Sequence, residues 1–169
     1  MLENRVKIAY LSIGSNLGNK KKNIDLIKFK LERNHIKIIK SSNKYESLSW
    51  PDIRKPKYLN VVLKVKTYLS PKNLMTKCLT IEKELGRTRN KKNEPRICDI
   101  DIIDYDNKII LDKTNKFLEI PHPRMHNRNF VLLPLYEISK NWVHPVKKVS
   151  ITKLIKSLKI NDLTSIKIT

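Results

Sequence analysis

The stretch YLNVVLKVKTYL, Tyr58 to Leu69, together with the Ser70-Pro71 pair after it, decides the fold class of this chain. Its apolar residues alternate around Val61, Leu63 and Val65, which is the two-residue period of a β-strand. Serine is a favoured N-cap and proline a favoured first helical residue, so we expect a helix to begin directly after the strand.

The residues before this stretch predict a strand, a helix and another strand. Residues 6–13 form a short apolar run rich in β-branched residues, and residues 36–47 also have strand composition. Between them, residues 20–33 have helical periodicity, with a stripe formed by Ile24, Ile27 and Leu31. Residues 48–57 contain two prolines, so they are expected to form a loop.

The residues after it predict a helix and a further strand. The helix would bury an apolar stripe formed by Leu74, Cys78, Ile81 and Leu85, and Gly86 would end it. Residues 98–105 are expected to form a strand that ends in an Asp106-Asn107 turn.

The C-terminal third is less regular. We expect a rigid turn at 121–124, an apolar segment in which Pro134 precludes a long regular helix, and a last short helix, 151–158, capped by Ser150.

The predicted order is β-α-β-β-α-β over one domain, residues 1–169. Some strands follow one another without a helix, which favours an α+β fold with a mostly antiparallel sheet over a doubly wound parallel one. This order is the ferredoxin-like pattern.

The chain is strongly basic, with a formal net charge of +20. One interpretation is a nucleic-acid binder, because lysine and arginine neutralise phosphates. The other is that lysine is simply the surface residue this sequence favours, and the even spread of lysines along the chain favours it. In either case the charge would attract anionic small molecules such as a nucleotide.

The two cysteines, Cys78 and Cys98, form no CxxC pair, which indicates a reducing, cytoplasmic compartment. The apolar run near the N-terminus is too short for a signal peptide or a membrane span, so no membrane partner is expected.

The segment GRTRNKKNEPRICDID, Gly86 to Asp101, holds three arginines (Arg87, Arg89 and Arg96) and ends in Asp99 and Asp101. Arginine binds phosphate oxygens in a two-pronged way, and closely spaced carboxylates bind Mg²⁺. On a strand both aspartates would point to one face, whereas Asp104 has the opposite parity and is assigned to the turn. The alternative interpretations are that the arginines lie in a solvated basic loop and that the two aspartates are solvated acids on an exposed edge strand.

Three further residues are weaker candidates for a phosphate site. Glu82 lies one turn before Gly86, and His122 lies between two prolines with Arg128 close behind. The chain has no GxxxxGK[ST] or GxGxxG motif, so an ATP site would use side-chain clamps, with the basic loop closing over the phosphates.

Several segments together resemble the 6-hydroxymethyl-7,8-dihydropterin pyrophosphokinase family of folate biosynthesis. The matching pieces, in the order and spacing of the family, are AYLSIGSNLG near the start, PKYLNVVLKV, IEKELGRTR, PRICDIDII and PHPRMHNRNFVLLPL. The resemblance implies a monomer with a mostly antiparallel sheet flanked by helices in three α-β-α layers. It also implies transfer of a diphosphoryl group from ATP to 6-hydroxymethyl-7,8-dihydropterin, which releases AMP.

The resemblance also assigns roles on the nucleotide side. Asp99 and Asp101 match the residues that hold two Mg²⁺ ions, and Arg87 and Arg96 match arginines of the mobile loop that assist the transfer. The positions that match ATP-contacting residues are Glu82, His122 and Arg128, and those that match the adenine pocket are Ile102 and Leu118.

On the pterin side, Asn60 matches the side chain that hydrogen-bonds the pterin edge, and Tyr58 and Phe130 match the aromatic pair that sandwiches the ring. The backbone contacts of the family fall on Ser47, Leu48 and Trp50.

The chain departs from the family pattern before the aspartates. Where the family usually has RWGPR, this chain has KNEPR, with Asn93 in place of the tryptophan and Glu94 in place of the glycine, and the loop is one residue shorter. The alternatives to the enzyme are a basic nucleic-acid-binding module on this fold and a catalytically weakened relative.

Overall fold

The computed structural model describes residues 2–87, 94–111 and 117–169. Its main elements, in chain order, are β1 (Leu2–Ser15), α1 (Lys20–Arg33), β2 (Lys37–Ser41), β3 (Tyr45–Ser47), β4 (Tyr58–Leu69), α2 (Pro71–Glu84) and β5 (Asp99–Tyr105). The shorter elements that follow are β6 (Ile110–Leu111), β7 (Glu119–Ile120), η1 (Met125–Asn127), α3 (Asn129–Ile138), α4 (Ile151–Lys156), α5 (Ile160–Thr164) and β8 (Lys167–Ile168).

The main sheet has the strand order β5-β1-β4-β3-β8, and β2 also pairs with β4. Each of these pairs is antiparallel. Near the end of β1, Gly14 lies opposite Asn60 on β4 and opposite Asp99 on β5. The register thus places β4, with the predicted pterin ligand Asn60, and β5, with the predicted metal ligand Asp99, on the two sides of Gly14.

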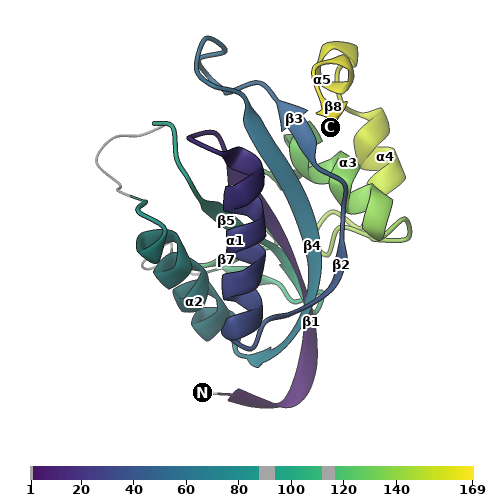
Figure 1. Ribbon diagram of the computed structural model, residues 1–169. Coiled ribbons are helices and arrows are strands. Elements are labelled where there is room, and N and C mark those ends of the chain that lie inside the picture. Colours follow the sequence, from purple (N-terminus) through teal and green to yellow (C-terminus); the bar gives the residue numbers. More distant parts are fainter. Residues whose placement is uncertain (1, 88–93, 112–116) are drawn as a thin grey trace.

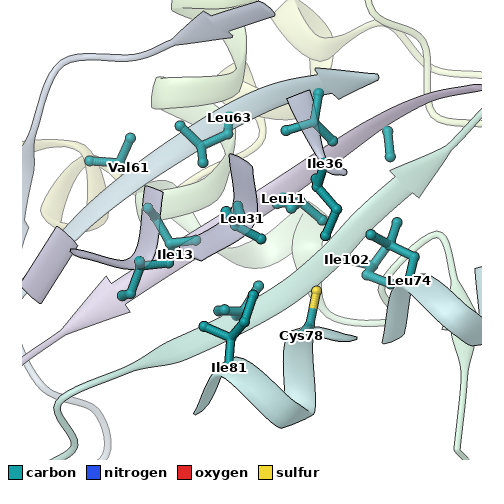
Figure 2. Close-up of a cluster of buried hydrophobic side chains, with 14 of the residues drawn as sticks. Leu11, Ile13, Leu31, Ile36, Val61, Leu63, Leu74, Cys78, Ile81 and Ile102 are labelled. Atoms are coloured by element: carbon teal, nitrogen blue, oxygen red, sulfur yellow. The ribbon is translucent and has the colours of Figure 1, made fainter. Parts of the chain in front are cut away.

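Helices cover both faces of this sheet, α1 and α2 on one face and α3 with α4 on the other (Figure 1). Alternate residues of the central strands enter the two cores: Val61 and Leu63 pack with α1 and α2, whereas Val62 packs with α3. Figure 2 shows the first core, where Leu31 of α1 and Ile81 of α2 meet the sheet. Burial on both faces explains why the successive residues Val61, Val62 and Leu63 of β4 are all apolar, and helices on both faces of an antiparallel sheet confirm the α+β, ferredoxin-like prediction.

The predicted ends of helix α1, and the predicted start and stop signals of α2, are confirmed. Helix α1 spans the expected residues, and α2 begins after Ser70, whose hydroxyl accepts a hydrogen bond from the Asn73 N–H at 3.3 Å. Gly86 follows α2 with φ of +83°, a backbone conformation that glycine adopts without steric cost. Helix α4 is capped by Ser150 as expected, but it ends at Lys156.

Four sequence-based expectations were wrong or incomplete. Helix α3 runs through Pro134, because burial of its apolar face outweighs the hydrogen bond that proline cannot donate. Residues 36–47 form two strands, β2 and β3, instead of one. Helix α5 and strand β8 were not predicted. The structure shows β8 as a strand because it pairs with β3, which is distant in the sequence.

The fourth correction concerns Asp104, which lies within β5 and not in the turn. The pairing of β1 with β5 shifts between Tyr10 and Leu11, so β5 carries one extra residue there. The bulge reverses the side-chain parity, and Asp104 points to the same face as Ile103, where it is buried with 1% exposure. Among the described residues, no helix is long and apolar enough to cross a membrane.

Candidate active site

Asp99 and Asp101 lie at the start of β5 and point to the same face of the sheet, as strand geometry requires. Between and beyond them, Ile100 and Ile102 point to the opposite face and are buried in the first core. The apolar residues therefore anchor the strand and leave both carboxylates partly exposed at its edge.

Two arginines from either side of the basic loop contact the first carboxylate. Arg87 Nη1 lies 2.6 Å from Asp99 Oδ1, and Arg96 Nη1 donates to the same oxygen at 3.3 Å. Burial and the neighbouring Asp101 carboxylate raise the pKa of Asp99, and the two arginines oppose that rise. The arginines therefore offset part of the cost of placing this carboxylate in a partly buried position beside a second one.

The second carboxylate is contacted from the segment before α3. Arg128 Nη1 donates to Asp101 Oδ2 at 3.1 Å, and His122 Nε2 lies 3.7 Å from that oxygen. Burial, with the charges of Arg128 and Arg124, lowers the pKa of His122 to about 4, so the imidazole is neutral near pH 7. Its Nδ1 accepts a hydrogen bond from the Arg124 N–H at 3.2 Å, which leaves the proton on Nε2.

Glu82 is more important to this arrangement than its sequence signal suggested. Its side chain is 2% exposed, accepts a hydrogen bond from the Ile100 N–H at 2.7 Å and pairs with Arg87. The carboxylate thereby joins the end of α2, the strand β5 and a loop arginine. The signal was its place one turn after Cys78, on the buried stripe of the helix.

The pterin side of the predicted site lies across Gly14 from these groups. Asn60 is 4% exposed, and its Nδ2 donates to Ser47 Oγ at 2.9 Å and to the Tyr45 carbonyl at 3.2 Å. A Cβ atom on Gly14 would lie 3.3 Å from Asn60 Oδ1, so glycine leaves the amide its space.

The two aromatic residues predicted to contact pterin, Tyr58 and Phe130, each lie near an arginine of the charged cluster. Burial raises the pKa of Tyr58, and the charge of Arg96 and its hydrogen bond to the phenol oppose the rise. The Arg128 guanidinium lies over the Phe130 ring, 5.5 Å from its centroid. In the loop between β3 and β4, Leu48 and Trp50 are exposed, at 39% and 78%.

Not every predicted residue joins this cluster. Ile102 and Leu118 are buried in the first core, with 3% and 6% exposure, so their packing is accounted for without a nucleotide. Arg89 and the substituted position Asn93 lie outside the described residues. Asn16 was not predicted as a site residue, yet its buried side chain contacts both the Arg96 backbone and the loop before β4.

The donor set suits a cation that also binds phosphate. Within residues 2–87, 94–111 and 117–169, no three His, Cys, Asp or Glu side chains are grouped as a complete metal site. Mg²⁺ takes one or two carboxylates and draws its other ligands from phosphate and water, and Asp99 with Asp101 fits that pattern.

The comparisons with known proteins agree on one family. Residues 10–140 match the model of 7,8-dihydro-6-hydroxymethylpterin-pyrophosphokinase (HPPK). The chain is 41% identical over 137 residues to 2-amino-4-hydroxy-6-hydroxymethyldihydropteridine pyrophosphokinase of Aquifex aeolicus, covering 81% of this chain and 83% of that protein. It is 43% identical over 155 residues to folic acid synthesis protein fol1 of Pneumocystis carinii, covering 91% of this chain and 20% of that protein.

The chain thus spans about a fifth of that relative and 22% of folic acid synthesis protein FOL1 of Dictyostelium discoideum. Among solved structures, Plasmodium falciparum HPPK-DHPS with pterin and p-hydroxybenzoate has a TM-score of 0.74 at 18% identity. That match covers 98% of this chain and 48% of that one, and at such low identity it supports the fold alone.

Proposed function

The chain belongs to the 7,8-dihydro-6-hydroxymethylpterin-pyrophosphokinase family, and from that premise we propose that it transfers the diphosphoryl group of ATP to 6-hydroxymethyl-7,8-dihydropterin in folate biosynthesis. The hydroxymethyl oxygen attacks the β-phosphorus, and AMP leaves. The observation that carries the proposal is the convergence of the Asp99 and Asp101 carboxylates with three arginines beside the buried amide of Asn60.

The charge arrangement suits a Mg-triphosphate. Two Mg²⁺ ions held by Asp99 and Asp101 would neutralise the phosphate oxygens during transfer. Arg87, Arg96 and Arg128 now contact those carboxylates, and with cations there instead they are free to turn to the phosphates. Glu82 pairs with Arg87 at the end of α2, so this arginine would remain beside the site after its contact with Asp99 is lost.

The remaining ATP contacts follow from family position and chemistry. A neutral His122 with its proton on Nε2 donates a hydrogen bond to a phosphate oxygen without adding a charge. Ile102 and Leu118 would supply the apolar edge of the adenine pocket, which requires the first core to offer part of its surface to the base.

The pterin ring would lie between Tyr58 and Phe130, with its edge on Asn60 and on the backbone of Ser47, Leu48 and Trp50. Both amide donors of Asn60 are aimed at β3, which fixes the side chain and directs Oδ1 toward Gly14. With both donors used, the amide offers its Oδ1 acceptor, so it would pair with a donor on the pterin edge and select the orientation of the ring. Offset stacking on the two rings would add affinity.

We also propose that the protein works as a cytoplasmic monomer and takes neither nucleic acid nor a membrane as a partner. The basic charge then serves to draw an anionic nucleotide toward the site. Light scattering at assay concentration tests the monomer, and a gel-shift titration with RNA tests the nucleic-acid alternative. Tight, salt-dependent RNA binding without pterin binding would support that alternative instead.

The deciding experiment is product analysis. Incubation with Mg-ATP and 6-hydroxymethyl-7,8-dihydropterin is expected to yield AMP in proportion to pterin diphosphate, and EDTA is expected to abolish both. Formation of ADP, or of no AMP, would contradict diphosphoryl transfer. A mixture without pterin controls for ATP hydrolysis.

A further inference from the structure

The side chain of Asn16 joins two parts of the site that the sheet does not hold together. It lies in the turn after β1, two residues past Gly14, and is 3% exposed. Strand pairing reaches Gly14 with Asp99 on one side, and Ser15 with Leu59 on the other. Beyond that point, Arg96 and the loop before β4 emerge from neighbouring strands without a ladder between them.

On the side of β5, Asn16 makes two hydrogen bonds with the backbone of Arg96. The Asn16 N–H donates to the Arg96 carbonyl at 3.0 Å, and the Arg96 N–H donates to Asn16 Oδ1 at 2.7 Å. The pair fixes the backbone of the arginine whose guanidinium reaches Asp99. Without these bonds, the backbone of Arg96 would be joined to the sheet through the strand that begins three residues later.

On the side of β4, the side-chain amide of Asn16 makes two hydrogen bonds with the loop 48–57. Asn16 Nδ2 donates to the Pro56 carbonyl at 3.1 Å and to Ser49 Oγ at 3.3 Å. Ser49 Oγ in turn donates to the Pro56 carbonyl at 2.5 Å, which closes the base of the loop. The amide therefore contacts the loop that carries Trp50 and leads into Tyr58.

The three side-chain contacts are satisfied by only one orientation of the amide. The oxygen accepts from an N–H, and the nitrogen donates to a carbonyl, so neither atom can be exchanged for the other. Aspartate keeps the acceptor and loses both donors, while alanine loses both functions. The two halves of the contact can thus be separated by substitution.

We propose that Asn16 is a positioning residue, which holds the Arg96 backbone and the pterin-side loop 48–57 in register across the end of β1. It acts on phosphoryl transfer through Arg96 and on pterin affinity through the loop, without touching either substrate. This inference rests on the proposed diphosphoryl transfer.

The test compares Asn16→Ala and Asn16→Asp with Thr67→Val. Thr67 is a matched control because its buried hydroxyl also makes two hydrogen bonds, with His35 and Leu69, at the far end of β4. A bond of this kind contributes up to about tenfold in an equilibrium or a rate. Steady-state kinetics would give kcat and the KM for pterin, and amide hydrogen exchange would report on the Arg96 N–H.

Asn16→Ala is expected to lower kcat about tenfold, raise the pterin KM about tenfold and expose the Arg96 amide to exchange. Asn16→Asp is expected to raise the pterin KM similarly while kcat stays within about threefold and the Arg96 amide stays protected. Thr67→Val is expected to lower thermal stability with neither kinetic change. If Asn16→Ala does not fold, Asn16→Asp decides alone, since a uniform loss of activity differs from a KM effect.

The inference is overturned if the Asn16 variants show only the stability loss of Thr67→Val, or if the Arg96 amide exchanges equally in all of them. Hydrogen exchange and pterin binding by Trp50 fluorescence need no turnover. A wild-type protein that forms no AMP would therefore refute the proposed reaction while these two measurements still decide the role of Asn16.

Discussion

Strand β5 carries aspartates at both ends on the same face of the sheet, and these aspartates differ in their exposure and in the groups that contact them. At its start, Asp99 and Asp101 are partly exposed and contact the guanidinium groups of arginines. Near its end, Asp104 is 1% exposed and accepts hydrogen bonds from Trp142 Nε1 at 2.7 Å and from the Asn107 N–H at 3.1 Å.

The difference lies in the partners and not in the residue type. Guanidinium groups on long side chains can leave a carboxylate when a cation and a phosphate offer both sides better partners. An indole and a backbone amide are fixed by packing, so the carboxylate at Asp104 has no comparable exchange available. The first pair suits a binding site, and the second residue suits a structural link between the sheet and the segment after α3.

The largest expected effect comes from Asp101→Asn. Loss of one carboxylate should lower kcat/KM by about a thousandfold, because Asp101 would help to hold the Mg²⁺ that neutralises the transferred phosphates in the transition state. Thermal stability should change little, since the residue is partly exposed. Retention of near-normal AMP formation in this variant would disprove the metal assignment.

The same substitution at the other end, Asp104→Asn, should reverse the pattern. An amide there would oppose one of the two donors, Trp142 Nε1 or the Asn107 N–H, and leave it unsatisfied in a buried site. We expect a loss of about 2 kcal/mol in the free energy of unfolding, with kcat nearly unchanged for the folded protein. Urea unfolding measures the first quantity, and a fall in kcat as large as that of Asp101→Asn would contradict the division between the two ends.

A smaller effect is expected from Gly14→Ala, beside the proposed pterin ligand Asn60. The added Cβ would lie 3.3 Å from Asn60 Oδ1, so the amide must shift by a few tenths of an ångström. We expect the pterin KM to rise several-fold, about 1 kcal/mol of binding, with the KM for ATP unchanged. Equal changes in both KM values would indicate a disturbance of the whole site instead.

The smallest expected effect is on the pH dependence of stability, and it comes from His144. Burial, and then His126 and Lys147, lower the pKa of His144, whose Nδ1 accepts from the Val146 and Lys147 N–H groups. The unfolded state then binds the proton more readily, so stability is lost as pH falls below about 6.5.

His144→Asn keeps an acceptor near the same place and removes the titration. Its unfolding free energy should therefore fall less steeply than that of the wild type as pH decreases from about 6.5. Denaturant unfolding over this pH range tests the slope, and identical slopes in the two proteins would show that other groups cause the acid loss.

Local patterns in the sequence predicted the regular elements well. Helix α1 and strand β4 have the expected bounds, because their periodicity and end signals are contained in a few adjacent residues. Tertiary packing decided the exceptions: Pro134 lies inside a helix because its neighbours are buried, and β8 is a strand because β3 pairs with it.

The candidate site was predictable where a motif carried the chemistry. Asp99, Asp101 and the flanking Arg87 and Arg96 lie within one short segment, and the structure brings His122 and Arg128 to them. Glu82 had only a weak signal and Asn16 none, because their roles depend on backbone groups of distant segments, which sequence patterns do not report.

The amino-acid sequence settled which residue types were available, which face of helices α1 and α2 is apolar, and which family the chain resembles. Only the tertiary structure decided that Asp104 is buried while Asp101 is not. A bulge in β5 reversed the side-chain parity between them, and such a shift arises from pairing with β1 and cannot be read from β5 alone.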